Sequence, residues 1–519
     1  MTDTFTEAER LALSPYVSNL DSPIFALRNL PEEVVAVLFA YYSRSPHSLR
    51  RNLLRLLQEG DLELSPIAGA ASEPEDGDRL ASAREKARAF HEKWVVGYGH
   101  GSVAEHGCVH LALEDISIIA SKLVEDGRLA SYTEKSTRYV AFDPSKIYYP
   151  ARLMAEPALA AVYQNTVSAL LSAYAGWTED FVAQIKALAP RTAKQTERGH
   201  ETASRATAFD TLRYLLPAAT HTNIGLTLNA RALEHLITKL LSQPLEEGHL
   251  LGAQLKAEAQ HIVPTLLKYA DRSEYRADTP PGIARLAHSL LPPAPAQTIS
   301  PEGLAETPSV TLVSIDPHAE DTLVASILYE HAGRPMTALL AQVRAMNTAA
   351  KEQVIDAYLA RRGRHDAPGR ALERISCTLE MQMDYGAYRD VQRHRMATQS
   401  LQPLTPALGY VTPPLVTQFG CGARYDDLMH TAQDAYAQIH ASGLAEEAAY
   451  ILPLATRIRT LFTWNLREMA HFIELRSARQ GHPAYRRVAQ DAYHALAEAQ
   501  PLIARYLRPN LNDYALTRE

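Results

Sequence analysis

Cysteine is scarce in this sequence, and its placement argues against two kinds of site. The 519 residues include three cysteines, Cys108, Cys377 and Cys421, which lie far apart and form no CxxC pair. An odd and scattered set of this kind indicates neither a disulfide framework nor a cysteine-based zinc site. We therefore expect a protein of a reducing compartment, the cytoplasm.

Long apolar runs and an excess of positive charge are also missing. No window approaches the roughly 18 uninterrupted apolar residues of a membrane helix, and the opening residues MTDTFTEAER have neither the basic nor the apolar part of a secretion signal. The 52 Lys and Arg residues against 59 Asp and Glu give a net charge of -7. This balance argues against broad binding to nucleic acid or membrane, so local arginine clusters must hold any anionic ligand.

The sequence does contain an internal repeat, and at 46% hydrophobic residues it has enough apolar material for a large core. The run Arg213–Pro217 recurs as Ala449–Pro453, and Asn229–Arg231 recurs as Asn465–Arg467, each 236 positions later. Repeats in the same order and at the same offset indicate one fold written twice.

Two further landmarks extend the repeat toward the N-terminus. An apolar helical run near residue 35 recurs 289 positions later, and Arg128, which leads into Tyr139, recurs 267 positions later as Arg395, which leads into Tyr410. The falling offset indicates that the first half carries insertions.

The repeat predicts two domains of the same class. We place the first at residues 1–277, a Pro/Ala-rich linker at 278–304 and the second domain at 305–519. Most segments repeat apolar residues with a helical period, and residues 309–315 alternate as an edge strand does. We expect each half to be α+β, rich in helix around a small sheet.

The segment Gly99–His106 is the first candidate for binding chemistry. Its glycines bring backbone N–H groups close to a ligand, Ser102 stands where a helix would begin, and Glu105 lies one turn inside. This arrangement favours an anionic cofactor group. A capped helix with ordinary histidines remains an alternative, and the spacing matches no zinc motif, so we expect no metal.

The second candidate is the segment Asp126–Tyr139. Its Glu134 can accept a hydrogen bond from a ring N–H, while Ser136 and Arg138 place a hydroxyl beside a guanidinium that can bind phosphate. A nucleoside monophosphate would use all three groups. A polar loop with surface ion pairs is the alternative.

The second half carries arginines in two places. A predicted helix over 388–395 ends in Arg393–Arg395, whose side chains would point about 100° apart, so at least one should enter a cleft. Positive charge at a helix C-terminus is the simpler alternative. Arg467 and Arg476 lie nine residues apart on a predicted aromatic helix and need anionic partners that the local sequence does not offer.

Together these motifs resemble the flavin-dependent thymidylate synthase family, the thymidylate synthase complementing proteins, over nearly the whole chain and once per half. The family pattern is GHxSxxEH, then R-H-R-x7-S leading to an R-Y pair, then a helix with L-P, N-x-R and L-R. The first half matches it at His100, Ser102, Glu105, His106, Arg128, Ser136, Arg138, Tyr139 and Arg213.

Each half departs from this family pattern, and the departures are complementary. The first half has Glu125–Arg128 in place of R-H-R, one residue too long, and Leu240 in place of the last arginine. The second half keeps Arg393–Arg395 and Arg476 but has Ala449 where the first half has an arginine before L-P. Neither half alone holds a complete site.

The resemblance implies reductive methylation of dUMP to dTMP, with FAD as cofactor and with NADPH and methylenetetrahydrofolate as co-substrates. Family members are homotetramers with shared sites, so a fused pair implies a homodimer that forms a pseudo-tetramer, with composite sites and two of the four positions competent. The resemblance assigns catalysis to Arg476, Arg393 and His394; cofactor binding to His100, Ser102, Glu105, Arg393, His394, Arg395, Asn465 and Arg467; and nucleotide binding to Arg128, Glu134, Ser136, Arg138, Arg213 and Arg476.

Two other functions stay open on the sequence. The broken signatures are compatible with a catalytically silent relative that binds nucleotide or flavin as a scaffold or regulator. A flavoenzyme for another pyrimidine nucleotide or one-carbon donor is equally compatible, because a fold does not fix a substrate.

Overall fold

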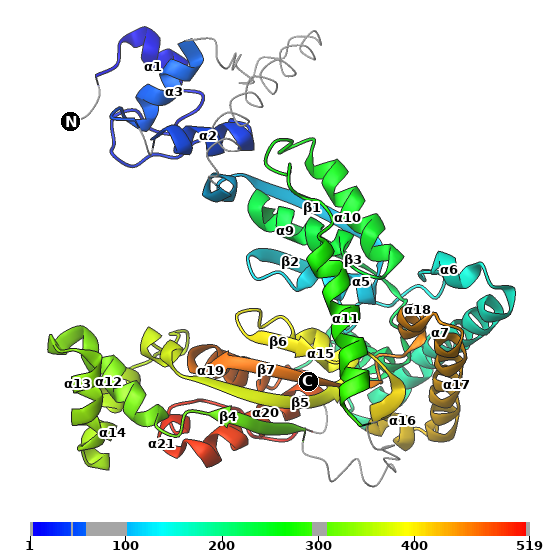
Figure 1. The fold of residues 1–519 in the computed structure, drawn as a ribbon. Coiled ribbons are helices and arrows are strands. Elements are labelled where there is room, and N and C mark those ends of the chain that lie inside the picture. The colour runs from blue at the N-terminus through cyan, green and yellow to red at the C-terminus, as the bar shows by residue number, and fades with distance from the viewer. Residues whose placement is uncertain (1–3, 43–44, 59–100, 293–308, 515–519) are drawn as a thin grey trace. The chain divides into compact units, whose positions relative to one another are not determined.

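The computed structural model describes residues 4–42, 45–58, 101–292 and 309–514 (Figure 1). They belong to two compact units that alternate along the chain, so the units do not coincide with the two halves of the repeat. The first unit is Met1–Glu114, Leu129–Glu134 and Asn223–Pro292, and the second is Asp115–Arg128, Lys135–Thr222 and Pro293–Glu519.

The first unit begins with three helices that share a small apolar core. Helices α1 (Glu7–Leu13), α2 (Glu32–Tyr42) and α3 (Leu49–Gln58) bury leucine, valine and aromatic side chains against one another. Thr6 caps α1 in a capping box with Glu9, which satisfies backbone N–H groups at the start of the helix.

A three-stranded sheet follows in the chain, in the order β1-β3-β2, formed by β1 (Cys108–Ser117), β3 (His221–Asn229) and β2 (Ala130–Glu134). The central strand β3 alternates buried residues with more exposed ones, as expected of a sheet with one face on the core. The other described elements of this unit are the 3-10 helix η2 (Gly101–Glu105) and helices α9 (Ala230–Leu241), α10 (Glu246–Ala259) and α11 (Glu274–Leu290).

The second unit contains a four-stranded antiparallel sheet in the order β4-β5-β7-β6. The segment predicted as an edge strand is confirmed, since β4 (Val310–Ile315) is the outer strand beside β5 (Ser376–Asp384). The other strands are β7 (Arg457–Asn465) and β6 (Thr398–Leu401).

Helices supply most of the rest of the second unit. From the first half come α5 (Ile118–Glu125), α6 (Ala151–Met154), α7 (Pro157–Leu188), α8 (Glu197–Leu212) and η3 (Arg213–Leu215). From the second half come α12 (Ala319–Ala332), α13 (Met336–Arg344), α14 (Thr348–Leu359), η4 (Arg370–Arg374), α15 (Tyr385–Val391), η5 (Pro406–Leu408), α16 (Pro414–Gln418), α17 (Gly422–Ala441), α18 (Ala445–Ala448), η6 (Ala449–Ile451), α19 (Leu466–Arg476), α20 (Pro483–Ala499) and α21 (Pro501–Ala504).

The predicted duplication is visible in the hydrogen bonds of the second unit. Ala218 donates its backbone N–H to the carbonyl of Leu452, and Leu454 donates to the carbonyl of Leu216. The donors of the two bonds are 236 residues apart, and so are the acceptors, so the repeat relates one bond to the other. Pro217 and Pro453 face each other between them. The two halves therefore meet at their L-P motifs. The α+β fold in two tandem copies is confirmed.

The same comparison corrects the alignment of the two arginine signatures. Ser117 caps α5 as Asp384 caps α15, 267 positions later, and Ser131 on β2 pairs with β3 as Thr398, also 267 positions later, pairs with β7. Because the offset is 267 at both Ser117 and Ser131, the first half has no extra residue between these two positions. The segment Asp126–Arg128 is thus the direct counterpart of Arg393–Arg395, and the expected one-residue insertion was wrong.

Three smaller sequence expectations also change. Tyr410 bridges to Thr456 as Ile147 bridges to Thr220, so Ile147, and not Tyr139, is its counterpart. Helix α15 ends at Val391, and the R-H-R triplet lies in the turn that follows, not on the helix. The aromatic residues expected beside Arg467 on a long helix lie partly on strand β7 instead.

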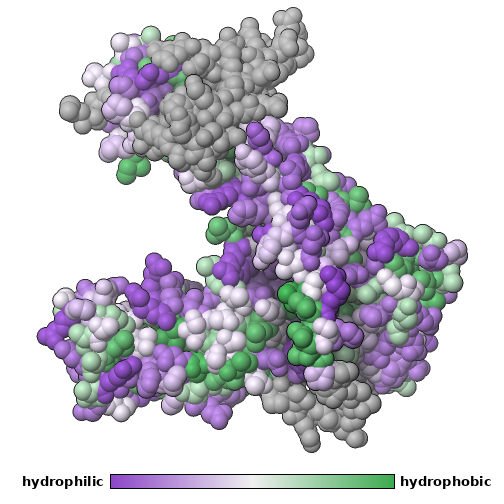
Figure 2. All heavy atoms as spheres, viewed as in Figure 1, coloured by the Kyte–Doolittle hydropathy of each residue, from purple (hydrophilic) through white to green (hydrophobic). Residues whose placement is uncertain are grey.

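Among the described residues, no helix is long and apolar enough to cross a membrane. Hydrophilic residues make up much of the face seen in Figure 2. The Pro/Ala-rich segment predicted as a linker begins within helix α11, which contains Pro280 and Pro281, and its residues from 293 onward lie outside the described part of the chain.

Candidate functional site

Arg138, a predicted nucleotide ligand, is held by a buried carboxylate on α8. Its Nε and Nη2 lie 2.7 Å and 3.0 Å from the two carboxylate oxygens of Asp210, a bidentate pair. Burial opposes the charge of Arg138, but Asp210 outweighs this and raises the pKa of the guanidinium. Ser136 accepts a hydrogen bond from the Arg138 backbone N–H at 3.2 Å, so the two predicted ligands are adjacent.

Tyr485 on α20 joins Arg138 to Arg476, the predicted catalytic residue of the second half. The Tyr485 hydroxyl accepts a hydrogen bond from Arg138 Nη1 at 2.8 Å. The guanidinium carbons of Arg138 and Arg476 lie 5.6 Å and 5.4 Å from the centre of the Tyr485 ring. Because both lie within cation–π distance of one ring, the repeat brings an arginine from each half to one place.

Asp390, at the end of α15, lies at the centre of these charges. Burial favours its neutral form, yet Arg213, Arg393, Arg476 and Arg138 together lower the pKa of its carboxyl group. Arg213 Nη1 lies 3.5 Å and Arg393 Nη1 lies 3.7 Å from its oxygens. Asp390 therefore stays ionised and organises arginines of both halves.

We call Arg138, Arg213, Arg393 and Arg476 the arginine cluster. Its four guanidiniums exceed the carboxylates of Asp210 and Asp390, and they still do so when Asp384, whose pKa burial raises, is counted. Arg393 is exposed and the other three arginines are buried or half-buried, so the excess positive charge lies where the cluster meets solvent and attracts an anion. The arrangement is thus suited to an anionic ligand.

Arg213 lies deepest in the arginine cluster, with 1% of its surface exposed. Its Nε and Nη2 are buried N–H groups for which the described residues provide no acceptor, so an anionic oxygen would satisfy them. The counterpart of Arg213 in the second half is Ala449. A direct contact between Arg213 and a nucleotide would nevertheless require neighbouring side chains to move.

His394 is the buried member of the R-H-R triplet, while Arg393 is exposed and Arg395 is half-buried. The histidine is the member that turns inward, and it packs in the core against Trp464, and against Phe472 on α19. Burial, with a smaller contribution from the nearby Arg476, lowers the pKa of His394 to about 4, although the hydrogen bond to Glu468 raises it. His394 is neutral at pH 7.

The other predicted site residues of the second unit make contacts within the protein. Arg467 donates to the Pro368 carbonyl and pairs with Glu373 at 2.8 Å, which is the anionic partner that the local sequence did not reveal. Asn465 caps α19 by accepting from the Glu468 N–H. Arg128 Nη2 lies 3.3 Å from the Thr398 hydroxyl. None of these contacts joins the arginine cluster.

The remaining predicted residues lie in the first unit or outside the described residues. Ser102 is exposed on η2, and Glu105 pairs with Arg231 at 2.5 Å. Glu134 ends strand β2 opposite Ile224. His100 lies outside the described part of the chain.

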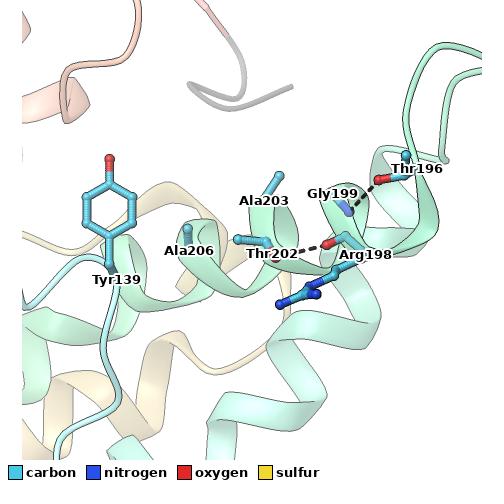
Figure 3. A pocket seen from close by; sticks show the side chains of 7 residues that line it. All are labelled: Tyr139, Thr196, Arg198, Gly199, Thr202, Ala203 and Ala206. Atoms are coloured by element: carbon cyan, nitrogen blue, oxygen red, sulfur yellow. Dashed lines mark hydrogen bonds between the residues drawn. The ribbon is translucent and has the colours of Figure 1, made fainter.

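A shallow pocket of about 490 Å³ lies on the second unit beside Tyr139 (Figure 3). Small residues of α8, namely Gly199, Ala203 and Ala206, line it, and Thr196 caps the helix by accepting from the Gly199 N–H. Tyr139 follows Arg138 in the chain, so the pocket adjoins the segment that carries the predicted nucleotide ligands.

Four residues of this site were missed by the sequence interpretation: Asp210, Asp390, Glu468 and Tyr485. Asp210 and Asp390 each precede an arginine of the cluster by three residues, a spacing that places them on one helical face or turn. That spacing was the available signal. Tyr485 gave no signal, because its contact with Arg138 spans 347 residues.

His482 predicts how the stability of the protein depends on pH. It is buried, donates through Nε2 to the Asp210 carbonyl and accepts from the Ala484 N–H, so it is neutral; burial lowers its pKa from 6.5 to about 3. Since the unfolded chain binds the proton more tightly, the stabilisation is present above pH 6.5 and decreases as the pH falls toward 3. At pH 5 the loss amounts to about 2 kcal/mol.

Urea unfolding at pH 7.5 and pH 5 tests this prediction. We expect His482→Asn, in which the amide can still cap α20, to reduce the stability difference between the two pH values by about 2 kcal/mol. The exposed His365→Asn should leave that difference unchanged. An equal difference in wild type and His482→Asn would contradict the assignment of a neutral, buried His482.

Comparison with known proteins gives consistent matches. The family model described as thymidylate synthase complementing protein matches residues 55–265 and again 311–502. A UPF0159 protein of Chlamydia pneumoniae is 33% identical over 513 residues, covering 96% of this chain and 94% of that protein. A UPF0159 protein of Thermoplasma acidophilum is 27% identical, covering 84% and 91%.

More distant matches have names that state an activity. A flavin-dependent thymidylate synthase of Thermococcus kodakarensis is 28% identical over 152 residues, which is 28% of this chain and 52% of that enzyme. A solved structure of a UMP/dUMP methylase from Streptomyces cacaoi is 18% identical and covers 38% of this chain and 93% of its own, with a TM-score of 0.31. That score is too low to carry an argument about the fold.

Proposed function

We infer a function from the premise that this chain belongs to the thymidylate synthase complementing protein family, whose model matches both of its halves. We propose that the protein is a flavin-dependent enzyme for the reductive methylation of dUMP to dTMP, with methylenetetrahydrofolate and NADPH as co-substrates. We further propose one composite site per chain, at the arginine cluster. Over 96% of its length, the chain also aligns with a UPF0159 protein.

The observation that carries this proposal is the meeting of Arg138 and Arg476 at Tyr485. Arg138 comes from the half that kept the nucleotide-binding signature, and Arg476 comes from the half that kept the last arginine of the pattern. Each half thus supplies what the other lost.

In the proposed reaction, Ser136 and Arg138 bind the nucleotide phosphate, and the surplus charge of the cluster offsets its negative charge. Arg476 stabilises the negative charge that develops on the pyrimidine. The exposed guanidinium of Arg393 fits a phosphate-bearing ligand, so this residue would hold the flavin cofactor or the nucleotide, while the buried Arg213 supports the site through Asp390. A bound flavin would supply the redox chemistry.

The repeat also argues for a single site per chain. At the offsets of 236 and 267, the counterparts of Arg213, Arg393 and Arg476 are Ala449, Asp126 and Leu240. None of these counterparts is cationic, so the second ancestral site has lost its anion-binding groups. Two chains assembled as a pseudo-tetramer would hold two competent sites.

Spectroscopy of the purified protein tests the function. We expect yellow protein whose absorbance bleaches with NADPH only when dUMP is present, and a dUMP titration that saturates at one nucleotide per chain. Growth of a thymidine-requiring host that carries this chain would extend the result to living cells. Colourless protein that still binds dUMP would favour the silent scaffold and overturn the enzymatic proposal.

A further inference from the structure

We propose that Glu468 is a positioning residue, which acts through His394 to aim Arg476 at the reacting pyrimidine. The inference rests on the proposed function and adds to it a residue outside the predicted site. Glu468 lies in the first turn of α19, and Arg476 lies at its end. His394 comes from the turn after α15 and lies between them.

The hydrogen bonds give this chain of residues a fixed direction. Arg476 Nε lies 3.0 Å from His394 Nε2, and Glu468 Oε1 lies 3.2 Å from His394 Nδ1. An arginine Nε can only donate, so His394 Nε2 must be the acceptor. The imidazole proton is then on Nδ1, which donates a hydrogen bond to the Glu468 carboxylate. Glu468 therefore selects the tautomer that can bind Arg476.

Packing around His394 keeps the imidazole plane in place. Its ring centre lies 5.2 Å from that of Phe472 and 5.3 Å from that of His471, both on α19. The His394 side chain is 3% exposed and that of Glu468 is 16% exposed. Because little water reaches the pair, a wrong tautomer would leave two donors facing each other and a buried acceptor without a partner.

Burial keeps His394 neutral, which this role requires, and it outweighs the hydrogen bond to Glu468, which raises the pKa. The charged or titratable groups that face it are Glu468, Arg476 and His471, and burial is the largest influence on its pKa. A protonated imidazole would repel Arg476 and could not accept from it. With Nε held by the histidine, Arg476 has Nη1 and Nη2 for other contacts.

The first half of the chain provides an internal control for this inference. The counterparts of Glu468, His394 and Arg476 are Ala232, Gly127 and Leu240. All three members are absent from the first half. Side chains that serve one task are expected to be present or absent as a set, as they are in the two halves.

The first readout is kinetic. We expect Glu468→Ala to lower kcat with dUMP by roughly tenfold to a hundredfold, by analogy with the outer hydrogen-bond partners of metal-bound histidines, with little change in dUMP affinity. Glu468→Gln should restore most of the turnover, because its amide oxygen can still accept from Nδ1. Glu474→Ala removes another carboxylate from α19, one that pairs with Arg362, and should leave the turnover unchanged.

The second readout needs no activity. In protein with ¹⁵N-labelled histidine, the signals that disappear in His394→Asn identify His394. We expect a neutral imidazole protonated on Nδ1 between pH 5 and pH 8, and a shift toward the Nε2-protonated form in Glu468→Ala but not in Glu468→Gln.

The two readouts separate the two proposals. An unchanged His394 tautomer in Glu468→Ala, or equal losses in Glu468→Ala and Glu468→Gln, would overturn the role of Glu468. Wild-type protein that shows the expected tautomer but neither binds dUMP nor turns it over would overturn the proposed function and leave the hydrogen-bonded chain in place.

Discussion

Arg476→Ala is expected to lower kcat by about 10²- to 10³-fold, the usual effect of removing a group that stabilises charge in a transition state. The KM for dUMP should change far less, because the nucleotide phosphate is assigned to Arg138 and Ser136. Charge on the pyrimidine grows only as the reaction proceeds, so its partner acts on turnover more than on binding. Steady-state kinetics with dUMP as the varied substrate measures both constants.

Two further variants sharpen the test of Arg476. Arg476→Lys keeps the positive charge but lacks the Nε donor that contacts His394, so it should recover only a small part of the lost turnover. Arg505→Ala removes an arginine that pairs with Glu352 at the surface and should leave both constants unchanged. Parallel losses in kcat and in dUMP affinity in Arg476→Ala would contradict the assignment.

The repeat was predictable from the sequence because its signals are local and carry clear chemistry. The L-P motif that ends at Pro217 and Pro453 occurs where the two halves exchange backbone hydrogen bonds. Asn229 and Asn465 cap the helices that follow the central strands, and asparagine before a helix is a familiar start signal. Such signals fix the fold class and the order of elements.

The partners of the arginines could not be predicted in the same way. Arg138 finds Asp210 across 72 residues and Tyr485 across 347, and no sequence period connects positions so far apart. Arg467 and Arg476 are nine residues apart, which is two and a half turns, so they point to opposite sides of α19. Arg467 contacts Glu373 and Arg476 contacts His394. Tertiary packing decided which arginine joined the site.

The end of helix α15 shows the same limit. A helical period through residue 395 looked plausible, but His394 is buried against Trp464 and Phe472 while Arg393 is exposed. The chain leaves the helix after Val391, and the backbone N–H of His394 bonds to the Val391 carbonyl in a tighter turn. Burial of one imidazole outweighed the helical pattern of its neighbours.

Arg138→Ala is expected to destabilise the protein by about 3–5 kcal/mol, because it leaves the Asp210 carboxylate buried without its partner. The two side chains are 10% and 7% exposed, so water cannot replace the guanidinium at low cost. The same variant should bind dUMP weakly if Arg138 holds the phosphate. Urea unfolding measures the first effect and calorimetric titration the second.

A double variant separates these two effects. Arg138→Met with Asp210→Leu removes both charges and keeps similar volume, so it should recover most of the lost stability, since a buried ion pair is often replaceable by apolar residues. Affinity for dUMP should stay low, because the phosphate ligand is still missing. If the double variant is as unstable as Arg138→Ala, then the unpartnered carboxylate is not the cause. If it binds dUMP as the wild type does, Arg138 is not the phosphate ligand, and the composite site would have to lie elsewhere in the arginine cluster.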